Sequence, residues 1–175
     1  MEDENTPLLS VRDLQTHFFL DEGLVRAVDG VSFDIHRGKT LGVVGESGCG
    51  KSVTARSLMR IVDRPGRIIG GSMLLRRQRK DGSGQVDEIE IADLTDDGRE
   101  IRDIRGEVIG LVFQEPMTSF SPVHTIGAQI TEAIQLHRPF NDAQARARAT
   151  ELLTMVGVSR PAERLDELPF QLSGG

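Results

Sequence analysis

Short runs of apolar residues, separated by turns of glycine and charged residues, mark the first 114 residues of the chain as strand-rich. The run at 25–35 shows the pattern best, because Val31, Phe33 and Ile35 alternate with polar residues. We predict strands over residues 8–19, 25–35 and 86–91, and a strand or hairpin over 67–75. These segments predict an antiparallel β region at the start of the chain.

Two other apolar runs, at residues 40–44 and 108–113, show no alternation. Continuous apolar runs of this length are typical of strands that are buried on both faces of a parallel sheet. A helix is expected directly after the first run, over residues 52–62, and a short one over residues 100–105. We therefore predict that the antiparallel region leads into an α/β core.

After residue 114 the apolar spacing becomes helical, beginning with the isoleucines at 126, 130 and 134. A second helix is predicted over residues 143–156, with Asn141 as its N-cap and Gly157 as its stop. A short helix is expected at 161–168. We therefore predict two domains, a β-rich core over residues 1–114 and a helical subdomain over residues 115–175.

The composition favours a soluble globular protein, with 38% hydrophobic and 27% charged residues. The net charge of −6 argues against a broad nucleic-acid-binding surface. The one cysteine, Cys49, cannot form an intrachain disulfide, which fits a reducing compartment. No apolar stretch approaches the roughly 18 residues that span a bilayer, so any membrane role is expected to come through a partner.

Residues 45–52 carry the pattern G-x-x-x-x-G-K-S, which is typical of loops that bind the phosphates of nucleotides. Glycines let successive backbone N–H groups turn inward around an anion, the lysine reaches the β- and γ-phosphates, and the serine hydroxyl ligates Mg²⁺. The apolar run before the loop and the helix after it both fit, which disfavours a chance glycine-rich turn. The residues are Gly45, Glu46, Ser47, Gly48, Cys49, Gly50, Lys51 and Ser52.

Two further motifs follow the phosphate loop. Gln114 ends the apolar run at 108–113, and the chain ends in L-S-G-G, from Leu172 to Gly175. With these three motifs in this order, the chain resembles the nucleotide-binding subunit of an ATP-binding cassette (ABC) transporter. The matching features are its Walker A loop, its Q-loop glutamine and the start of its LSGGQ signature.

Three segments are similar to the branch of the family that imports dipeptides and oligopeptides, and that also includes nickel importers. They are residues 27–33, 45–52 and 113–122. The resemblance implies an α/β fold of the P-loop NTPase class, the ABC-type nucleotide-binding domain. Such a domain has an N-terminal antiparallel β region, a RecA-like core, which is partial here, and a helical subdomain.

The resemblance also implies roles for single residues, with ATP and Mg²⁺ as cofactors. Lys51 and Gln114 would act in catalysis, and Ser52 and Gln114 at the metal. Phe18 would stack on adenine, with Phe19 as the alternative; a core position for Phe18 and a strand-end role for Gln114 are the structural alternatives. Glu46, Ser47 and Cys49 would contribute mainly backbone N–H groups.

The resemblance finally implies partners and a location. The chain would be the ATPase subunit of an importer, peripheral on the cytoplasmic face of the inner membrane. Transmembrane permease subunits and a second, identical or related, ATP-binding subunit would be its direct partners, and a solute-binding protein an indirect one; no nucleic acid is expected. Ser173, Gly174 and Gly175 would serve the nucleotide of the second subunit.

In the family, the Walker B aspartate and the catalytic glutamate follow the signature, beyond Gly175. We therefore expect a truncated chain that lacks the C-terminal core strands, is poorly stable alone and is doubtful as an ATPase by itself. A fragment that binds nucleotide without hydrolysis remains an alternative. So does a soluble ABC-type ATPase of DNA repair or chromosome structure, although no heptad array or cysteine cluster is present.

Overall fold

The computed structural model describes residues 6–79, 83–113 and 119–172. These residues form two compact units, Met1–Ile109 and Gly110–Gly175, which are described separately. The domain boundary expected between residues 114 and 115 lies outside the described residues, while the units divide slightly earlier.

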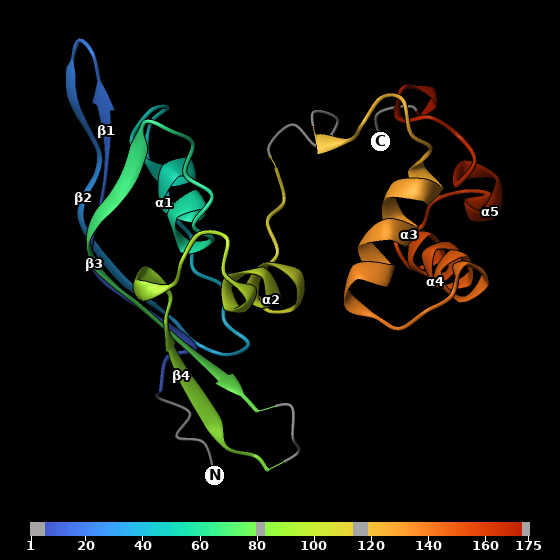
Figure 1. Cartoon of the computed structure of the whole chain (residues 1–175), viewed down its shortest axis with the longest axis horizontal. Coiled ribbons are helices and arrows are strands. Elements are labelled where there is room, and N and C mark those ends of the chain that lie inside the picture. The colour runs from blue at the N-terminus through green and yellow to red at the C-terminus, as the bar shows by residue number, and fades with distance from the viewer. Residues whose placement is uncertain (1–5, 80–82, 114–118, 173–175) are drawn as a thin grey trace. The chain divides into compact units, whose positions relative to one another are not determined.

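The first unit is built on a four-stranded antiparallel sheet with the strand order β2-β1-β3-β4 (Figure 1). Its strands are β1 (Leu9–Leu20), β2 (Gly23–Ile35), β3 (Gly66–Gln78) and β4 (Val86–Glu90). The predicted strands at 8–19, 25–35 and 86–91 are confirmed within two residues, and the segment at 67–75 is a strand of the β3–β4 hairpin. β1 has a hydrogen-bonded neighbour on each side and is therefore the centre of the sheet.

The sheet is bent where the register of β1 shifts against both neighbours, between Val11 and Leu14 on the β2 side. Asp13 adopts φ 48° there, and Gly71 of β3 adopts φ 96°. A Cβ on Gly71 would lie 2.6 Å from Asp13 O and from Leu14 Cα, so only glycine fits this crossing.

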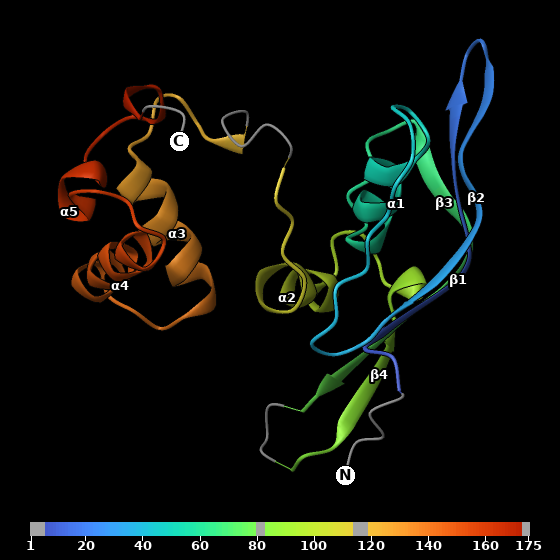
Figure 2. The same ribbon diagram turned by 180° about the vertical axis from the view of Figure 1, so that it is seen from behind.

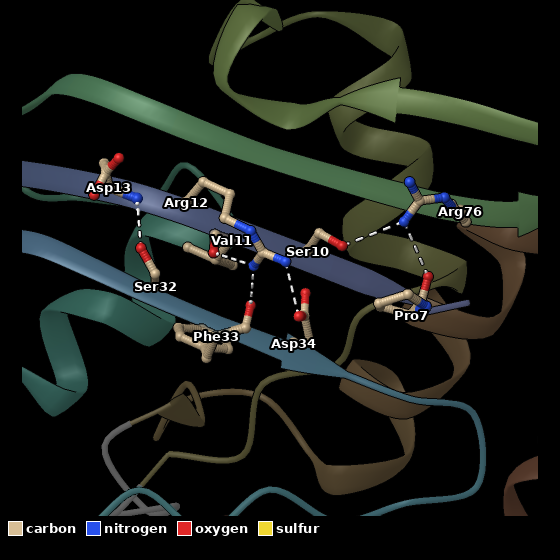
Figure 3. A network of polar contacts seen from close by, with 9 residues as sticks. All are labelled: Pro7, Ser10, Val11, Arg12, Asp13, Ser32, Phe33, Asp34 and Arg76. Atoms are coloured by element: carbon tan, nitrogen blue, oxygen red, sulfur yellow. Dashed lines mark hydrogen bonds and ion pairs between the residues drawn. The ribbon is translucent and has the colours of Figure 1, made fainter. Parts of the chain in front are cut away.

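Arg12 spans the bend and fastens β1 to the edge strand β2 (Figure 3). Its guanidinium donates to Asp34 Oδ2 at 2.7 Å and to Phe33 O at 3.2 Å. This hydrogen bond holds the pKa of the Asp34 carboxyl below its ordinary value and raises the pKa of Arg12.

Two helices, α1 (Lys51–Leu58) and α2 (Arg99–Glu107), lie on the same side of the sheet (Figures 1 and 2). A short 3₁₀ turn, η1 (Ile91–Asp93), follows β4. The aliphatic side chains between sheet and helices form the core of this unit. The buried members are Leu9, Val11, Leu14, Val28, Met73, Leu75, Ile89, Ile91, Ile101 and Ile104.

The helix after the phosphate loop is shorter than predicted, since α1 ends at Leu58 rather than at residue 62. Arg60 turns out of the helix with φ 51°. Arg105 of α2 donates to the carbonyls of Met59 (2.8 Å) and Arg60 (2.7 Å), which satisfies acceptors that a continuing helix would have used.

The two predicted buried parallel strands are wrong for the described residues. Residues 40–44 and 108–113 have no regular secondary structure. Val44 is 93% exposed and Val112 is 92% exposed. A strand needs hydrogen-bonded neighbours, and no described segment pairs with either run.

The second unit is helical, with α3 (Ile126–His137), α4 (Asp142–Met155), α5 (Pro161–Arg164) and the 3₁₀ turn η3 (Pro169–Gln171). The predicted helices at 126–137 and 143–156, the Asn141 cap and the Gly157 stop are confirmed. The short helix expected at 161–168 begins as predicted but ends at Arg164. Asn141 and Gln144 form a capping box, and Gly157 has φ 81°. Ile126, Ala145, Ala149 and Leu165 are buried in this unit.

Within the described residues, every helix is too short or too polar to cross a membrane.

Candidate functional site

The loop at residues 45–50 leads directly into α1 and is exposed for most of its length. Gly48 and Gly50 have φ 83° and 93°, a region that residues with a Cβ rarely adopt. Cys49 N donates to Glu46 O at 3.3 Å, which closes the loop on itself. Gly50 is also the N-cap of α1, so the loop ends at the positive pole of the helix dipole.

Gly50 is required for a second reason, because a Cβ at this position would overlap the carbonyl oxygen of Ala27. Ala27 is an extra residue of β2, since Thr16 pairs with Val28 and His17 with Arg26. The bulge at Ala27 is thus the place where β2 meets the end of the loop. Bulges commonly lie next to functional sites, where they redirect the backbone.

The ammonium group of Lys51 bridges the loop. It donates to Gly45 O and to Glu46 O, each at 2.7 Å, and lies 3.4 Å from Cys49 Sγ. These contacts hold the side chain back over the loop, so that its positive charge lies beside the backbone that would surround an anion. A Cβ on Gly45 would lie 2.5 Å from Cys49 Sγ, so the start of the loop lies close to the Cys49 side chain and leaves little room for a larger residue.

The first turn of α1 supplies two hydroxyl groups. Ser52, the expected metal ligand, is exposed. Thr54 is not part of the motif. Its hydroxyl donates to Gly50 O at 3.0 Å, and its backbone N–H donates to the same oxygen at 2.8 Å. Thr54 therefore fastens the glycine end of the loop to the helix.

These residues fit the phosphate groups of a nucleotide. For the metal ion that accompanies a nucleotide they offer fewer groups. The two positive-φ glycines, the carbonyl-held lysine and the helix start lie together in this loop, and such combinations are typical of anion-binding loops. For Mg²⁺, the described residues supply the Ser52 hydroxyl alone, because Gln114 lies outside them. In the described part of the chain, no group of three His, Cys, Asp or Glu side chains could hold a metal ion.

The two candidate adenine-stacking residues lie on different faces of β1. Phe18 is half-buried. Its ring lies close to Gly66, as does the side chain of Val62 in the segment that follows α1. Phe19 is exposed, and the guanidinium carbon of Arg67 lies 5.8 Å from the centroid of its ring. Since side chains alternate along a strand, only Phe18 shares the face that α1 covers. Its stacking role stays a prediction.

The remaining candidates, Gln114 and the signature residues Ser173, Gly174 and Gly175, lie outside the described residues. Their roles stay predictions.

The comparisons with known proteins identify the family of the chain. The family model described as "ABC transporter" matches residues 28–175, and the chain belongs to this family. The α/β ABC-type fold predicted from the sequence is confirmed, as is the resemblance to the peptide-importer branch.

Two curated relatives show the degree of similarity. The chain is 42% identical over 169 residues to the probable peptide ABC transporter ATP-binding protein y4tR of Sinorhizobium fredii. It is 40% identical over 168 residues to the dipeptide transport ATP-binding protein DppD of Escherichia coli. Each match covers 96% of the chain and 47% of the relative, so the chain spans about half the length of the curated relatives that it matches.

A solved structure shows the same fold at lower identity. The dimeric structure of MJ0796, a bacterial ABC transporter cassette, matches with a TM-score of 0.74 and 23% identity. The match covers 95% of this chain and 63% of that one.

Proposed function

We propose that the chain is the ATP-binding part of an ABC importer for dipeptides or oligopeptides, in which ATP hydrolysis drives uptake. The single observation that carries the proposal is the loop at residues 45–52, with Lys51 held across its carbonyls at the start of α1. The names of the relatives, which are peptide and dipeptide transport ATP-binding proteins, support the substrate class. They favour a transporter over an ATPase of DNA repair or chromosome structure.

The residues of the loop divide the work of holding the triphosphate. Backbone N–H groups between Glu46 and Gly50 surround the phosphate oxygens, and the start of α1 adds its dipole. Lys51 would neutralise charge on the β- and γ-phosphates, and the Ser52 hydroxyl would hold Mg²⁺. When bound, Mg²⁺ would supply positive charge for phosphoryl transfer. Gln114 would sense the γ-phosphate and transmit its presence to the membrane subunits.

The proposed assembly has two ATP-binding subunits on the cytoplasmic face of the inner membrane, together with transmembrane permease subunits. The importer class of the relatives supports the permease partners. The dimeric cassette of similar fold supports the pairing, whether with an identical or a related subunit. In this arrangement Ser173, Gly174 and Gly175 contact the nucleotide bound by the second subunit.

Replacing the loop lysine tests the proposal. We expect Lys51→Ala to weaken binding of a non-hydrolysable ATP analogue by at least about 30-fold, the effect of removing one partner of a close charge pair. Lys39→Ala is the matched control, because Lys39 is exposed in the turn before the loop and outside the motif. Equal affinities of Lys51→Ala and wild type, measured by titration calorimetry, would exclude the site.

Phosphate release, measured in parallel, tests the hydrolysis step separately. Binding with release supports an ATPase. Binding without release would favour the alternative, a chain that binds nucleotide but does not hydrolyse it.

A further inference from the structure

A pair of buried hydroxyl groups joins β1 to the helix that follows the phosphate loop. Thr16 Oγ1 lies 2.8 Å from Ser57 Oγ, and both residues are fully buried. Ser57 Oγ also donates to Val53 O, one turn earlier in α1, at 2.7 Å. Because this bond uses the one hydroxyl hydrogen of Ser57, Thr16 is the donor and Ser57 the acceptor between the two elements.

The pair differs from the rest of the face that α1 covers. The other inward positions of β1 include Val11 and Leu14, which make apolar contacts without a preferred direction. A hydrogen bond instead requires one distance and one orientation, and a buried hydroxyl that loses its partner is costly. The Thr16–Ser57 bond therefore fixes how α1 lies along β1 more narrowly than apolar packing does.

Each end of this bond leads to a different part of the candidate nucleotide site. Thr16 lies two residues before Phe18 on the same face of β1. Ser57 lies in the helix that begins at Lys51, about 9 Å along its axis at a rise of about 1.5 Å per residue. Two contacts fix α1 on the sheet. At the start of the helix, Gly50 packs against the carbonyl group of Ala27, and further along the helix Ser57 bonds Thr16. Two fixed points determine the direction of the helix, whereas one does not.

We propose that Thr16 and Ser57 are positioning residues that set the distance between Phe18 and the phosphate loop, so that one nucleotide reaches both. The proposal rests on the proposed function and on adenine stacking by Phe18. Neither hydroxyl touches the ligand, because both are enclosed between β1 and α1. They act through the placement of the helix and its loop.

The proposal predicts that the two residues matter only to a ligand that spans both parts of the site. In the full chain, Thr16→Val removes the donor and keeps the shape, and Ser57 keeps its bond to Val53. We expect the affinity for a non-hydrolysable ATP analogue to fall by up to about tenfold, because an indirect effect on binding is limited by the net contribution of the one hydrogen bond that is lost. The affinity for inorganic tripolyphosphate, which has no base, stays unchanged.

Two variants control for a general loss of structure. Thr16→Ser restores the donor and should restore the affinity for the analogue. Thr131→Val removes a hydroxyl that bonds Gly127 O within α3 of the other unit, and it should change neither affinity.

A double-mutant cycle with Phe18→Ala measures the coupling directly. In the Phe18→Ala background, Thr16→Val should have no further effect on the affinity for the analogue. The positioning role is overturned if Thr16→Val weakens both ligands equally, leaves both unchanged, or has its full effect without Phe18. If Thr16→Val does not fold, failure of Thr16→Ser to match wild type overturns it too.

Failure of the proposed function gives a different result. In that case wild type does not bind the analogue, or Lys51→Ala binds it as tightly as wild type does, whatever stands at position 16.

Discussion

β1 and the run at residues 40–44 are both rich in apolar residues, yet they end in opposite environments. Val11 and Leu14 of β1 are fully buried, while Val44 is 93% exposed. β1 lies between β2 and β3 and hydrogen bonds to both, whereas residues 40–44 pair with no described strand. An apolar run therefore becomes a buried strand only when neighbours satisfy its backbone.

The comparison predicts its largest effect in the core. Leu14→Ala should lower the free energy of unfolding by about 2–5 kcal/mol, because it removes buried methyl groups and leaves a cavity. Val44→Ala should change it by less than about 0.5 kcal/mol, as exposed substitutions do. Urea unfolding of the full chain measures both. Similar losses for the two variants would show that residues 40–44 are buried in solution.

A smaller effect is expected at Gly71, where β3 closely approaches the bulge in β1. Gly71→Ala should cost about 1–3 kcal/mol, because φ 96° strains the alanine and its Cβ meets the backbone of Asp13. Gly110→Ala is the matched control in the run at 108–113, since Gly110 is exposed and nothing lies within 4 Å of a Cβ there. The same unfolding measurement applies. A loss at Gly110 as large as at Gly71 would contradict the exposed placement of Gly110.

The helical unit offers a local contrast. Asn141→Ala should destabilise α4 by about 1 kcal/mol, because it removes the acceptor for Gln144 N at 2.9 Å. Asn141→Asp keeps an oxygen acceptor and should retain most of the stability. Helicity by circular dichroism during thermal unfolding reports the change. Equal behaviour of the two variants would show that the cap does not stabilise the helix.

The smallest effect is expected at the exposed pair Arg12–Asp34. The pKa of Asp34 lies below its ordinary value of 3.8 in the folded chain, so the pair stabilises the fold above that value. Its contribution disappears as the pH falls through the lowered pKa. Asp34→Asn should therefore reduce the melting temperature slightly at neutral pH and not at strongly acidic pH. An equal difference at both pH values would exclude the pair as the cause.

The features that the sequence predicts well are local ones. Alternation predicts β2, apolar residues followed by a turn signal predict β1, and the Asn141 cap with the Gly157 stop delimits α4. Each signal lies within or beside its element. The phosphate loop is likewise a contiguous motif, so its glycines and Lys51 are found without a structure.

The features that the sequence misses depend on distant partners. α1 ends at Leu58 because Arg105, far along the chain, takes the carbonyls of Met59 and Arg60. The close contact between Gly50 and Ala27 depends on the bulge in β2, and no local sequence pattern predicts this bulge. Thr16 is a polar residue at an inward position of β1, and this indicates a buried hydrogen bond. The sequence does not show that Ser57 is the partner.

The central place of β1 has a consequence for the order in which the protein is made. A nascent chain that has reached Leu58 holds the complete phosphate loop and α1, but β3, which begins at Gly66, does not yet exist. At that stage Thr16 stands on a two-stranded hairpin, which is marginally stable in water. The loop therefore leaves the ribosome before the sheet that supports its helix, and we expect it to gain affinity for nucleotide only after β3 has closed onto β1.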